Sequence, residues 1–83
     1  MSVTLLKKLL FSMILTECGI ESARIFKETF GNYNFSPYTQ KQLDPITFCL
    51  VPIQYDPAFS DRSQEVIEAY TLAIEKFTTK NRF

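Results

Sequence analysis

Few residues in this chain could do chemistry, and histidine, the commonest general base and metal ligand, is absent. The two cysteines, Cys18 and Cys49, both lie in apolar sequence. Without an imidazole, a cysteine nucleophile would need a lysine or a helix N-terminus to favour its thiolate. Cys18 instead lies near the end of a predicted helix, where the helix dipole disfavours negative charge. We therefore expect two buried, reduced thiols, with a Cys18–Cys49 disulfide as the alternative.

The remaining polar residues give no catalytic, metal-binding or nucleotide-binding signature. Glu65 and Glu68 are three residues apart, which is the spacing of an ordinary solvated helix face. A structural zinc ion takes about four nitrogen or sulfur ligands, and the chain offers two sulfurs and no imidazole. Gly19 and Gly31 are the only glycines, so a glycine-rich phosphate loop is excluded. The sequence predicts a protein that is not an enzyme and holds no metal or cofactor.

Composition predicts one small folded domain over residues 1–83. Hydrophobic residues make up 46% of the chain and aromatic residues 14%, which is enough for a packed core. A domain of this size buries only about 60–65% of its unfolded surface. Its stability is therefore marginal, and association as a homodimer would add to it. Lysine plus arginine equal aspartate plus glutamate at nine each, so the chain has no net charge to attract nucleic acid.

The N-terminal segment superficially resembles a leader peptide, because Lys7 and Lys8 precede an apolar run. That run, residues 9–15, is far shorter than the roughly 20 residues that span a bilayer. Glu17 directly precedes Cys18, which does not suit cleavage after a small residue. We expect a cytoplasmic protein with no membrane partner.

Hydrophobic periodicity predicts helices over residues 3–16, 20–30 and 61–78. The expected fold class is mainly α: a compact small domain of four to five helices, with the two long helices at the termini. These two should pack across the second helix and the middle of the chain. The apolar positions that recur at helical spacing, and should face the core, are Leu5, Leu6, Leu9, Leu10, Met13, Ile14, Ile20, Ala23, Phe26, Phe30, Val66, Ile67, Tyr70, Ala73, Ile74 and Phe77.

The apolar stretch DPITFCLVPIQYDP, residues 44–57, has two interpretations. Ser36, Asp44 and Asp56 each precede a proline, and a capping residue followed by proline favours the start of a short helix. The β-branched and aromatic content of residues 46–51 favours a short strand instead, and so an α+β fold. A strand would need residues 3–6 or a second copy of the chain as its partner. We favour the helix.

Protein recognition is the function that the middle of the chain favours. Tyr33, Phe35 and Tyr38 alternate with asparagine and serine in a predicted loop, and Tyr55 lies in the next flexible segment. Rigid aromatic side chains with adaptable polar neighbours are typical of contact surfaces. For Phe35 the alternative is that it fills a gap between helices. We expect a small non-enzymatic protein-binding regulatory module, of the size used by inhibitors, antitoxins, immunity proteins and mobile-element modulators of host machinery, whose partner is another protein.

A DNA-binding regulator is the alternative function, since the first two predicted helices can be laid on a helix-turn-helix frame at residues 5–30. The stretch CGIESARIFKETFG, residues 18–31, resembles the second DNA-binding unit of AraC-type regulators. The points of likeness are Gly19, Ile20, Ser22 and the FKETFG phrase.

The same stretch departs from the AraC-type pattern in two places. Its recognition segment is a helical turn short, and Leu15 stands where a small residue belongs. What the resemblance implies is contact with nucleic acid through the second helix. Arg24 and Lys27 are the basic side chains there, beside two acidic ones.

Overall fold

The computed structural model describes residues 2–81, and it describes side chains as far as Thr78. The prediction of a mainly α fold is confirmed, and the α+β alternative with a strand at residues 46–51 is wrong, because residues 2–81 contain no strand. The elements are α1 (Val3–Cys18), α2 (Ile20–Thr29), α3 (Gln40–Leu50), the short 3-10 helices η1 (Val51–Tyr55) and η2 (Pro57–Asp61), and α4 (Gln64–Asn81).

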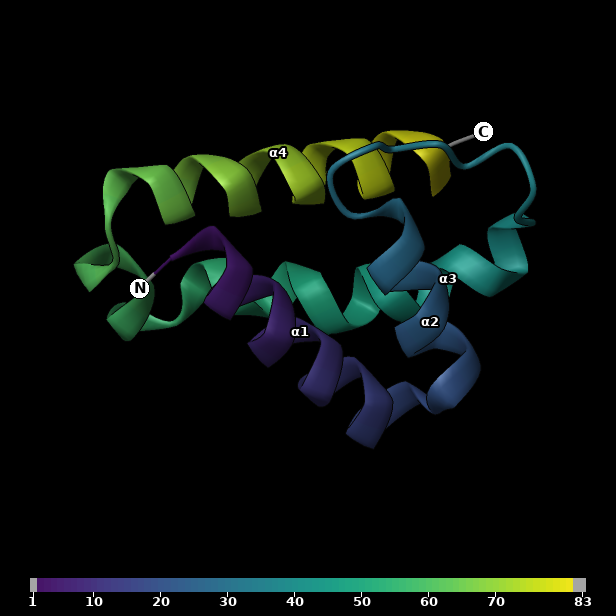
Figure 1. Ribbon diagram of the computed structural model, residues 1–83, viewed down its shortest axis with the longest axis horizontal. Helices are drawn as coiled ribbons and strands as arrows, with labels where there is room; N and C mark the ends of the chain where they lie inside the picture. The colour runs from purple at the N-terminus through teal and green to yellow at the C-terminus, as the bar shows by residue number, and fades with distance from the viewer. Residues whose placement is uncertain (1, 82–83) are drawn as a thin grey trace.

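The helices form two pairs of sequence neighbours (Figure 1). α1 and α2 fold back on each other, and α3 and α4 run antiparallel, joined through η1 and η2. α3 contacts each of the other three α-helices, whereas α1 and α4 touch over a small area. As predicted, both long helices pack on the middle of the chain, and α1 also packs on α2. The central helix is α3.

The corner between α1 and α2 is a single residue, Gly19. Its N–H donates to Leu15 O at 3.2 Å and ends α1, while its carbonyl accepts from Ala23 N at 3.2 Å and begins α2. Gly19 has φ 96°, a left-handed conformation that a residue with a Cβ rarely adopts. A single glycine is enough to reverse the helix direction here.

The start of α3 differs from the prediction. Thr39, not Ser36, caps the helix: Gln42 N donates to Thr39 Oγ1 at 3.3 Å, and Thr39 N donates to Gln42 Oε1 at 2.9 Å. This reciprocal capping box satisfies two helix-end donors. Ser36 lies in the preceding turn, which Tyr38 N closes by donating to Phe35 O at 3.0 Å. The short helix predicted to start after Ser36 is thus replaced by one that begins at Gln40.

The helical backbone passes through Pro45 and Pro52, the first two of the three prolines in residues 44–57. Pro45 lies inside α3, so Asp44 does not start a new helix, and the missing proline N–H removes one backbone bond without ending the helix. At Val51 the backbone stays helical (φ −56°, ψ −44°) and tightens into η1, with Pro52 in its first turn. Residues 40–55, the α3–η1 segment below, are therefore helical throughout. The cap predicted at Asp56, before Pro57, is confirmed, since Asp56 Oδ1 accepts from Ala58 N at 3.0 Å and caps η2.

α4 begins at Gln64 and Ser63 precedes it as the cap, whereas periodicity predicted a start at residue 61, which belongs to η2. Val66 N donates to Ser63 Oγ at 3.4 Å and Ile67 N to Ser63 O at 3.0 Å. The serine side chain satisfies a first-turn donor in the usual way of a cap.

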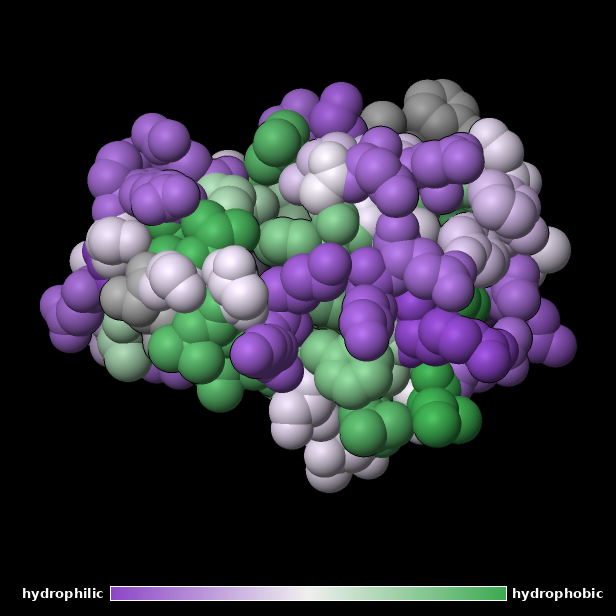
Figure 2. Space-filling model, viewed as in Figure 1, coloured by the Kyte–Doolittle hydropathy of each residue, from purple (hydrophilic) through white to green (hydrophobic). Residues whose placement is uncertain are grey.

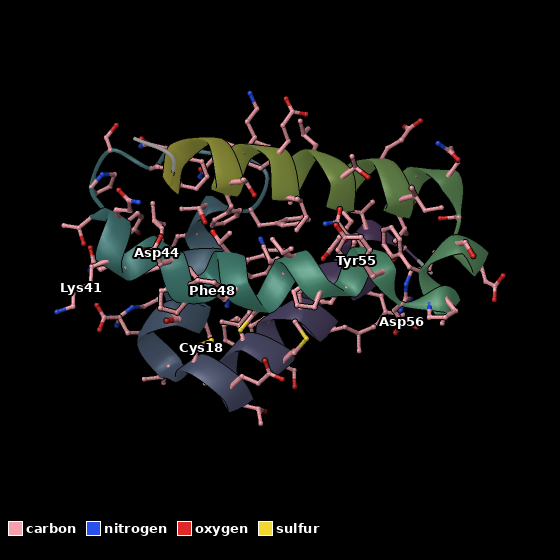
Figure 3. The ribbon with its side chains drawn as sticks, turned by 180° about the vertical axis from the view of Figure 1, so that it is seen from behind. Cys18, Lys41, Asp44, Phe48, Tyr55 and Asp56 are labelled. Atoms are coloured by element: carbon pink, nitrogen blue, oxygen red, sulfur yellow. The ribbon has the colours of Figure 1, made fainter. Side chains whose placement is uncertain are left out.

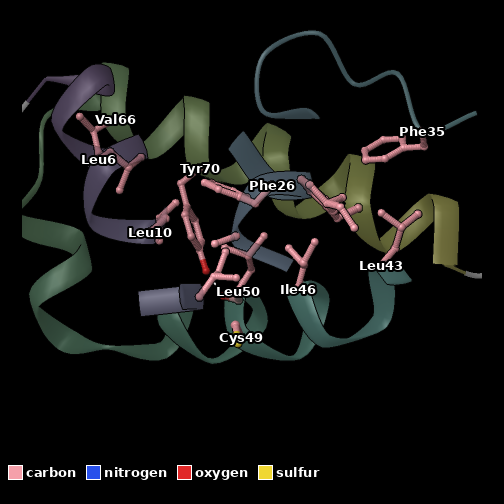
Figure 4. Packing of buried hydrophobic residues seen from close by; sticks show 14 of the residues in the cluster. Leu6, Leu10, Phe26, Phe35, Leu43, Ile46, Cys49, Leu50, Val66 and Tyr70 are labelled. Carbon is pink, nitrogen blue, oxygen red and sulfur yellow. Dashed lines mark hydrogen bonds between the residues drawn. The ribbon is translucent and has the colours of Figure 1, made fainter. Parts of the chain in front are cut away.

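Tyr70 of α4 lies at the middle of the core (Figure 4). Its hydroxyl donates to the carbonyl of Leu50, where α3 passes into η1, and its ring meets Phe59 edge-on with centroids 4.8 Å apart. The predicted inward positions are wrong for Ile20, which is 75% exposed at the start of α2, and for Leu5 and Leu9 of α1, which are each 46% exposed. The fully buried core side chains are Ile14, Ala23, Phe26, Leu43, Ile46, Leu50, Val66, Tyr70, Ala73 and Phe77.

The two cysteines meet where α1 packs on α3. Cys18 is partly buried and Cys49 is buried, and both are free thiols with their Sγ atoms 2.7 Å apart. Cys18 Sγ also lies 3.5 Å from Pro45 O, and Cys49 Sγ lies 3.5 Å from Glu17 Oε2. Burial raises the pKa of the Cys49 thiol from its ordinary 9.0 to about 12, with smaller contributions from Cys18 and Glu17.

The Tyr70 hydroxyl gives the first testable prediction. Tyr70→Phe keeps the ring but leaves the buried Leu50 carbonyl without this donor, so the free energy of unfolding should fall by about 1–2 kcal/mol in a urea titration. Leu72→Ala, on the exposed side of the same helix, is the control and should change it by less than about 0.5 kcal/mol. Equal stability of Tyr70→Phe and the parent protein would contradict this bond.

The Cys49 thiol predicts a loss of stability in alkali. Because its pKa is higher in the folded state, its contribution is complete below pH 9 and is lost as the pH rises toward 12. Urea titrations in reducing buffer should show the free energy of unfolding falling across this window. The fall from pH 9 upward should be shallower in Cys49→Ala, and parallel pH curves for the two proteins would show that Cys49 is not responsible.

Candidate functional site

The aromatic loop between α2 and α3 contributes one side chain to the core. Phe35 is only 8% exposed, and its ring meets Phe77 of α4 edge-on with centroids 4.9 Å apart (Figure 4). Phe35 is therefore not available as part of an exposed contact surface, because it fills the gap between the loop and α4. This is the alternative that the sequence left open for it.

Tyr33 and Tyr38 are half-buried and held by their neighbours. The Tyr33 ring lies 6.5 Å from that of Phe35, centroid to centroid, and its backbone has a left-handed φ of 54°. Burial raises the pKa of Tyr33. The Tyr38 hydroxyl donates to Glu28 Oε2, and this hydrogen bond is the main cause of the raised pKa of Tyr38. A role for either tyrosine in partner binding stays a prediction.

The polar residues of this loop brace its backbone. Asn32 Oδ1 accepts from Asn34 N at 2.9 Å, and Asn34 Oδ1 accepts from Ser36 N at 3.3 Å. These are side-chain turns that hold the chain in place. The asparagines that looked like adaptable contact residues in the sequence are therefore occupied within the loop.

Tyr55, by contrast, is 76% exposed, and it shares its surface with Phe48, which is 78% exposed. The two side chains are seven residues apart, about two helical turns, and so lie on one outward face of the α3–η1 segment (Figure 3). The exposed Pro52 lies between them in sequence. We call Phe48, Pro52 and Tyr55 the aromatic stripe. Its predicted member is Tyr55, and the sequence reasoning missed Phe48.

A helical wheel through residues 40–55 could have found Phe48. At about 100° per residue, Phe48 lies roughly 140° away from Leu43, and so on the opposite side from the buried face. The wheel applies only if Pro45 lies inside one helix, whereas we expected Asp44 to start a new one. An aromatic residue in so apolar a stretch is instead expected in the core or in a strand.

Charged side chains lie at both ends of the aromatic stripe. Lys41 and Asp44 precede Phe48 along α3, and Asp56 follows Tyr55 (Figure 3). An apolar centre with a polar rim is the usual anatomy of a protein interface. The stripe and its rim together form a surface that could receive another protein.

A second surface lies between α1 and α2 and is basic. Thr4, Lys7, Lys8, Phe11 and Lys27 line a shallow hollow of about 260 Å³. The Lys27 ammonium lies 5.8 Å from the Phe11 ring centroid, within cation–π range. Figure 2 shows hydrophilic side chains gathered over the middle of this face.

The two residues predicted to contact DNA are both on this side of the molecule. Arg24 and Lys27 are exposed and three residues apart on α2, so they share one face of the helix. The structure brings Lys27 together with Lys7 and Lys8 at the hollow, although these two were not predicted as nucleic-acid contacts. α2 has ten residues and ends at Thr29, which agrees with the short recognition segment noted in the sequence.

The clearly shifted pKa values all belong to tyrosine and cysteine side chains. The four described side chains whose pKa is clearly shifted, Tyr33, Tyr38, Cys49 and Tyr70, all shift upward and so away from neutral pH. An efficient proton-transfer group has a pKa near the operating pH. Residues 2–81 also contain no group of three or more cysteine, aspartate and glutamate side chains that could hold a metal ion.

Over the described part of the chain, no helix is long and apolar enough to cross a membrane. Comparison of the chain with protein-family models, with curated proteins and with solved structures found no match. What the protein does is therefore inferred from its own residues.

Proposed function

We propose that the protein is a small non-enzymatic module that binds another protein through the aromatic stripe. One observation carries this proposal: Phe48 and Tyr55 are each more than three-quarters exposed on the same face of one helical segment. Large aromatic side chains are enriched among the residues that dominate binding energy. Exposed apolar patches with a polar rim are typical of protein interaction sites.

The helix that carries the stripe is rigid before any partner arrives. Leu43, Ile46 and Leu50, on its other face, are completely buried against the remaining helices. Phe48 and Tyr55 are therefore held at a fixed spacing, and binding does not have to order the backbone between them. Less ordering on binding leaves more of the contact energy as affinity.

We propose a regulatory role for this module. Its type would be that of an inhibitor, an antitoxin, an immunity protein or a mobile-element modulator. The chain combines a packed core with an accessible aromatic surface, and such a surface can cover a site on another macromolecule. The same stripe could pair with its own copy in a homodimer, because an antiparallel arrangement would bring Lys41 of one copy near Asp56 of the other.

The stripe is tested by comparing the parent protein with Phe48→Ala and Tyr55→Ala as bait in quantitative pull-downs from the source cells. Each substitution should weaken recovery of the true partner about 10- to 30-fold, since truncated binding hot spots cost roughly 1.4–2 kcal/mol. Leu72→Ala, an exposed apolar side chain on α4, is the matched control and should leave recovery unchanged. Sedimentation velocity across a concentration series shows whether that partner is a second copy.

Stability measurements decide whether the stripe is a surface or a structural feature. Phe48→Ala and Tyr55→Ala should each change the free energy of unfolding by less than about 0.5 kcal/mol. Loss of more than about 1 kcal/mol together with normal partner recovery would assign these residues to packing and overturn the proposal.

DNA binding is the second candidate function, and the basic hollow favours it. Lys7, Lys8 and Lys27 face one depression between α1 and α2, so a neutral chain still presents a local positive surface. Arg24 extends that surface along α2. Clustered lysines bind phosphate backbones with strong salt dependence.

Fluorescence anisotropy with duplex DNA over a range of salt concentrations tests this second candidate. If the hollow binds DNA, Lys27→Gln should lower the slope of log affinity against log salt by about 1. Lys41→Gln, on α3, is the control with the same charge change and should leave the slope unaltered. Absence of binding at low salt would remove DNA binding as a function.

A further inference from the structure

The thiols of Cys18 and Cys49 lie close together, and they belong neither to the aromatic stripe nor to the basic hollow. Their sulfur atoms lie 2.7 Å apart although the residues are separated by 31 positions in the chain. Two cysteines on different elements can be bridged only where the backbone already brings their side chains together. α1 and α3 are packed on each other here, and the two sulfurs would have to approach only from 2.7 Å to the roughly 2.05 Å of a disulfide bond.

Neither thiol depends on the other for a hydrogen-bond acceptor. Cys18 Sγ has the Pro45 carbonyl oxygen at 3.5 Å, and Cys49 Sγ has Glu17 Oε2 at 3.5 Å. The contact between the sulfurs therefore follows from how the helices pack.

The two thiols differ in how easily a reagent can reach them. Cys18 is partly exposed at the end of α1, beside the exposed corner residue Gly19. Cys49 is buried, and its raised pKa keeps it protonated near neutral pH. An external reagent therefore meets Cys18 first, and Cys49 lies behind it as the second thiol.

We propose that Cys18 and Cys49 form a reversible intramolecular disulfide between α1 and α3 in the folded protein. The Cys18 thiolate attacks a low-molecular-weight disulfide such as oxidised glutathione, breaks its S–S bond and releases one thiolate. Cys49 then loses its proton and attacks the Cys18 sulfur of the mixed disulfide, and a second thiolate leaves. The two cysteines are oxidised, and the external disulfide is reduced to two thiols that take up the released protons.

The bond would act on the helix that carries the aromatic stripe. Cys49 directly follows Phe48 in α3, so a Cys18–Cys49 disulfide would fasten that part of α3 to the end of α1. It would also close a loop containing α2 and the aromatic loop, and closing a loop restricts the unfolded chain. The site is independent of the proposed binding function and would exist if that function were wrong.

The test uses the full reduced chain in buffers with graded ratios of oxidised to reduced glutathione. After acid quenching and maleimide labelling, intact mass gives the fraction of protein whose two thiols are protected. The measured quantity is the concentration of oxidised glutathione, divided by the squared concentration of reduced glutathione, at which half of the protein is oxidised. For the folded protein this value should be at least about 30-fold lower than for the same chain in urea. Peptide mapping should find Cys18 joined to Cys49, and the oxidised form should melt about 10 °C higher.

Single-cysteine variants identify the order of the two steps. Cys49→Ser should keep a glutathione adduct on Cys18, because the second thiol is missing. Cys18→Ser should remain unmodified while folded, because Cys49 is buried. If either variant fails to fold, the comparison of parent protein with and without urea still decides the matter. Equal oxidation in both states, a disulfide between two chains, or a stable glutathione adduct on the parent protein would each overturn the proposal.

Discussion

The burial of one face of α3 against three other helices is the constraint on which the rest of the structure depends. Leu43, Ile46 and Leu50 are completely enclosed on that face, and the Tyr70 hydroxyl binds the Leu50 carbonyl at the point where the α-helix tightens into η1. Since a buried carbonyl without a partner is costly, this bond matters most where the helical geometry changes. Fixing the inner face also fixes the outer one, and so the spacing of Phe48 and Tyr55.

Much of this fold was predictable because it follows local rules. The helical spacing of apolar residues gave α1, α2 and α4, and Gly19 marked the corner that its left-handed φ confirms. The buried face of α4, from Val66 to Phe77, also followed from periodicity. The errors came at places where two local signals compete. Thr39 with Gln42 makes a stronger cap than Ser36, and Pro45 is tolerated inside a helix that three neighbours hold in place.

The candidate surface was harder to predict than the fold, because exposure is a tertiary property. Tyr33, Phe35 and Tyr38 read as an exposed loop, yet Phe35 fills the core beside Phe77 and Tyr38 bonds to Glu28. Sequence cannot show which side of a loop faces α4. Phe48 was missed for the opposite reason, since an aromatic residue in an apolar stretch is usually buried. The meeting of Cys18 with Cys49 likewise depends on how α1 crosses α3, which neither residue's neighbours determine.

The pairing of α1 with α2 and of α3 with α4 has a consequence for how the chain folds. In each pair the partners follow one another in the chain, so each hairpin can form without the other. Such topologies fold rapidly, on the scale of microseconds to milliseconds, because little chain entropy is lost before favourable contacts form. The slow part of folding should be the docking of one helical hairpin on the other, when α3 meets α1 and α2. The aromatic loop, with Phe35 against α4, can take its final position only after that docking.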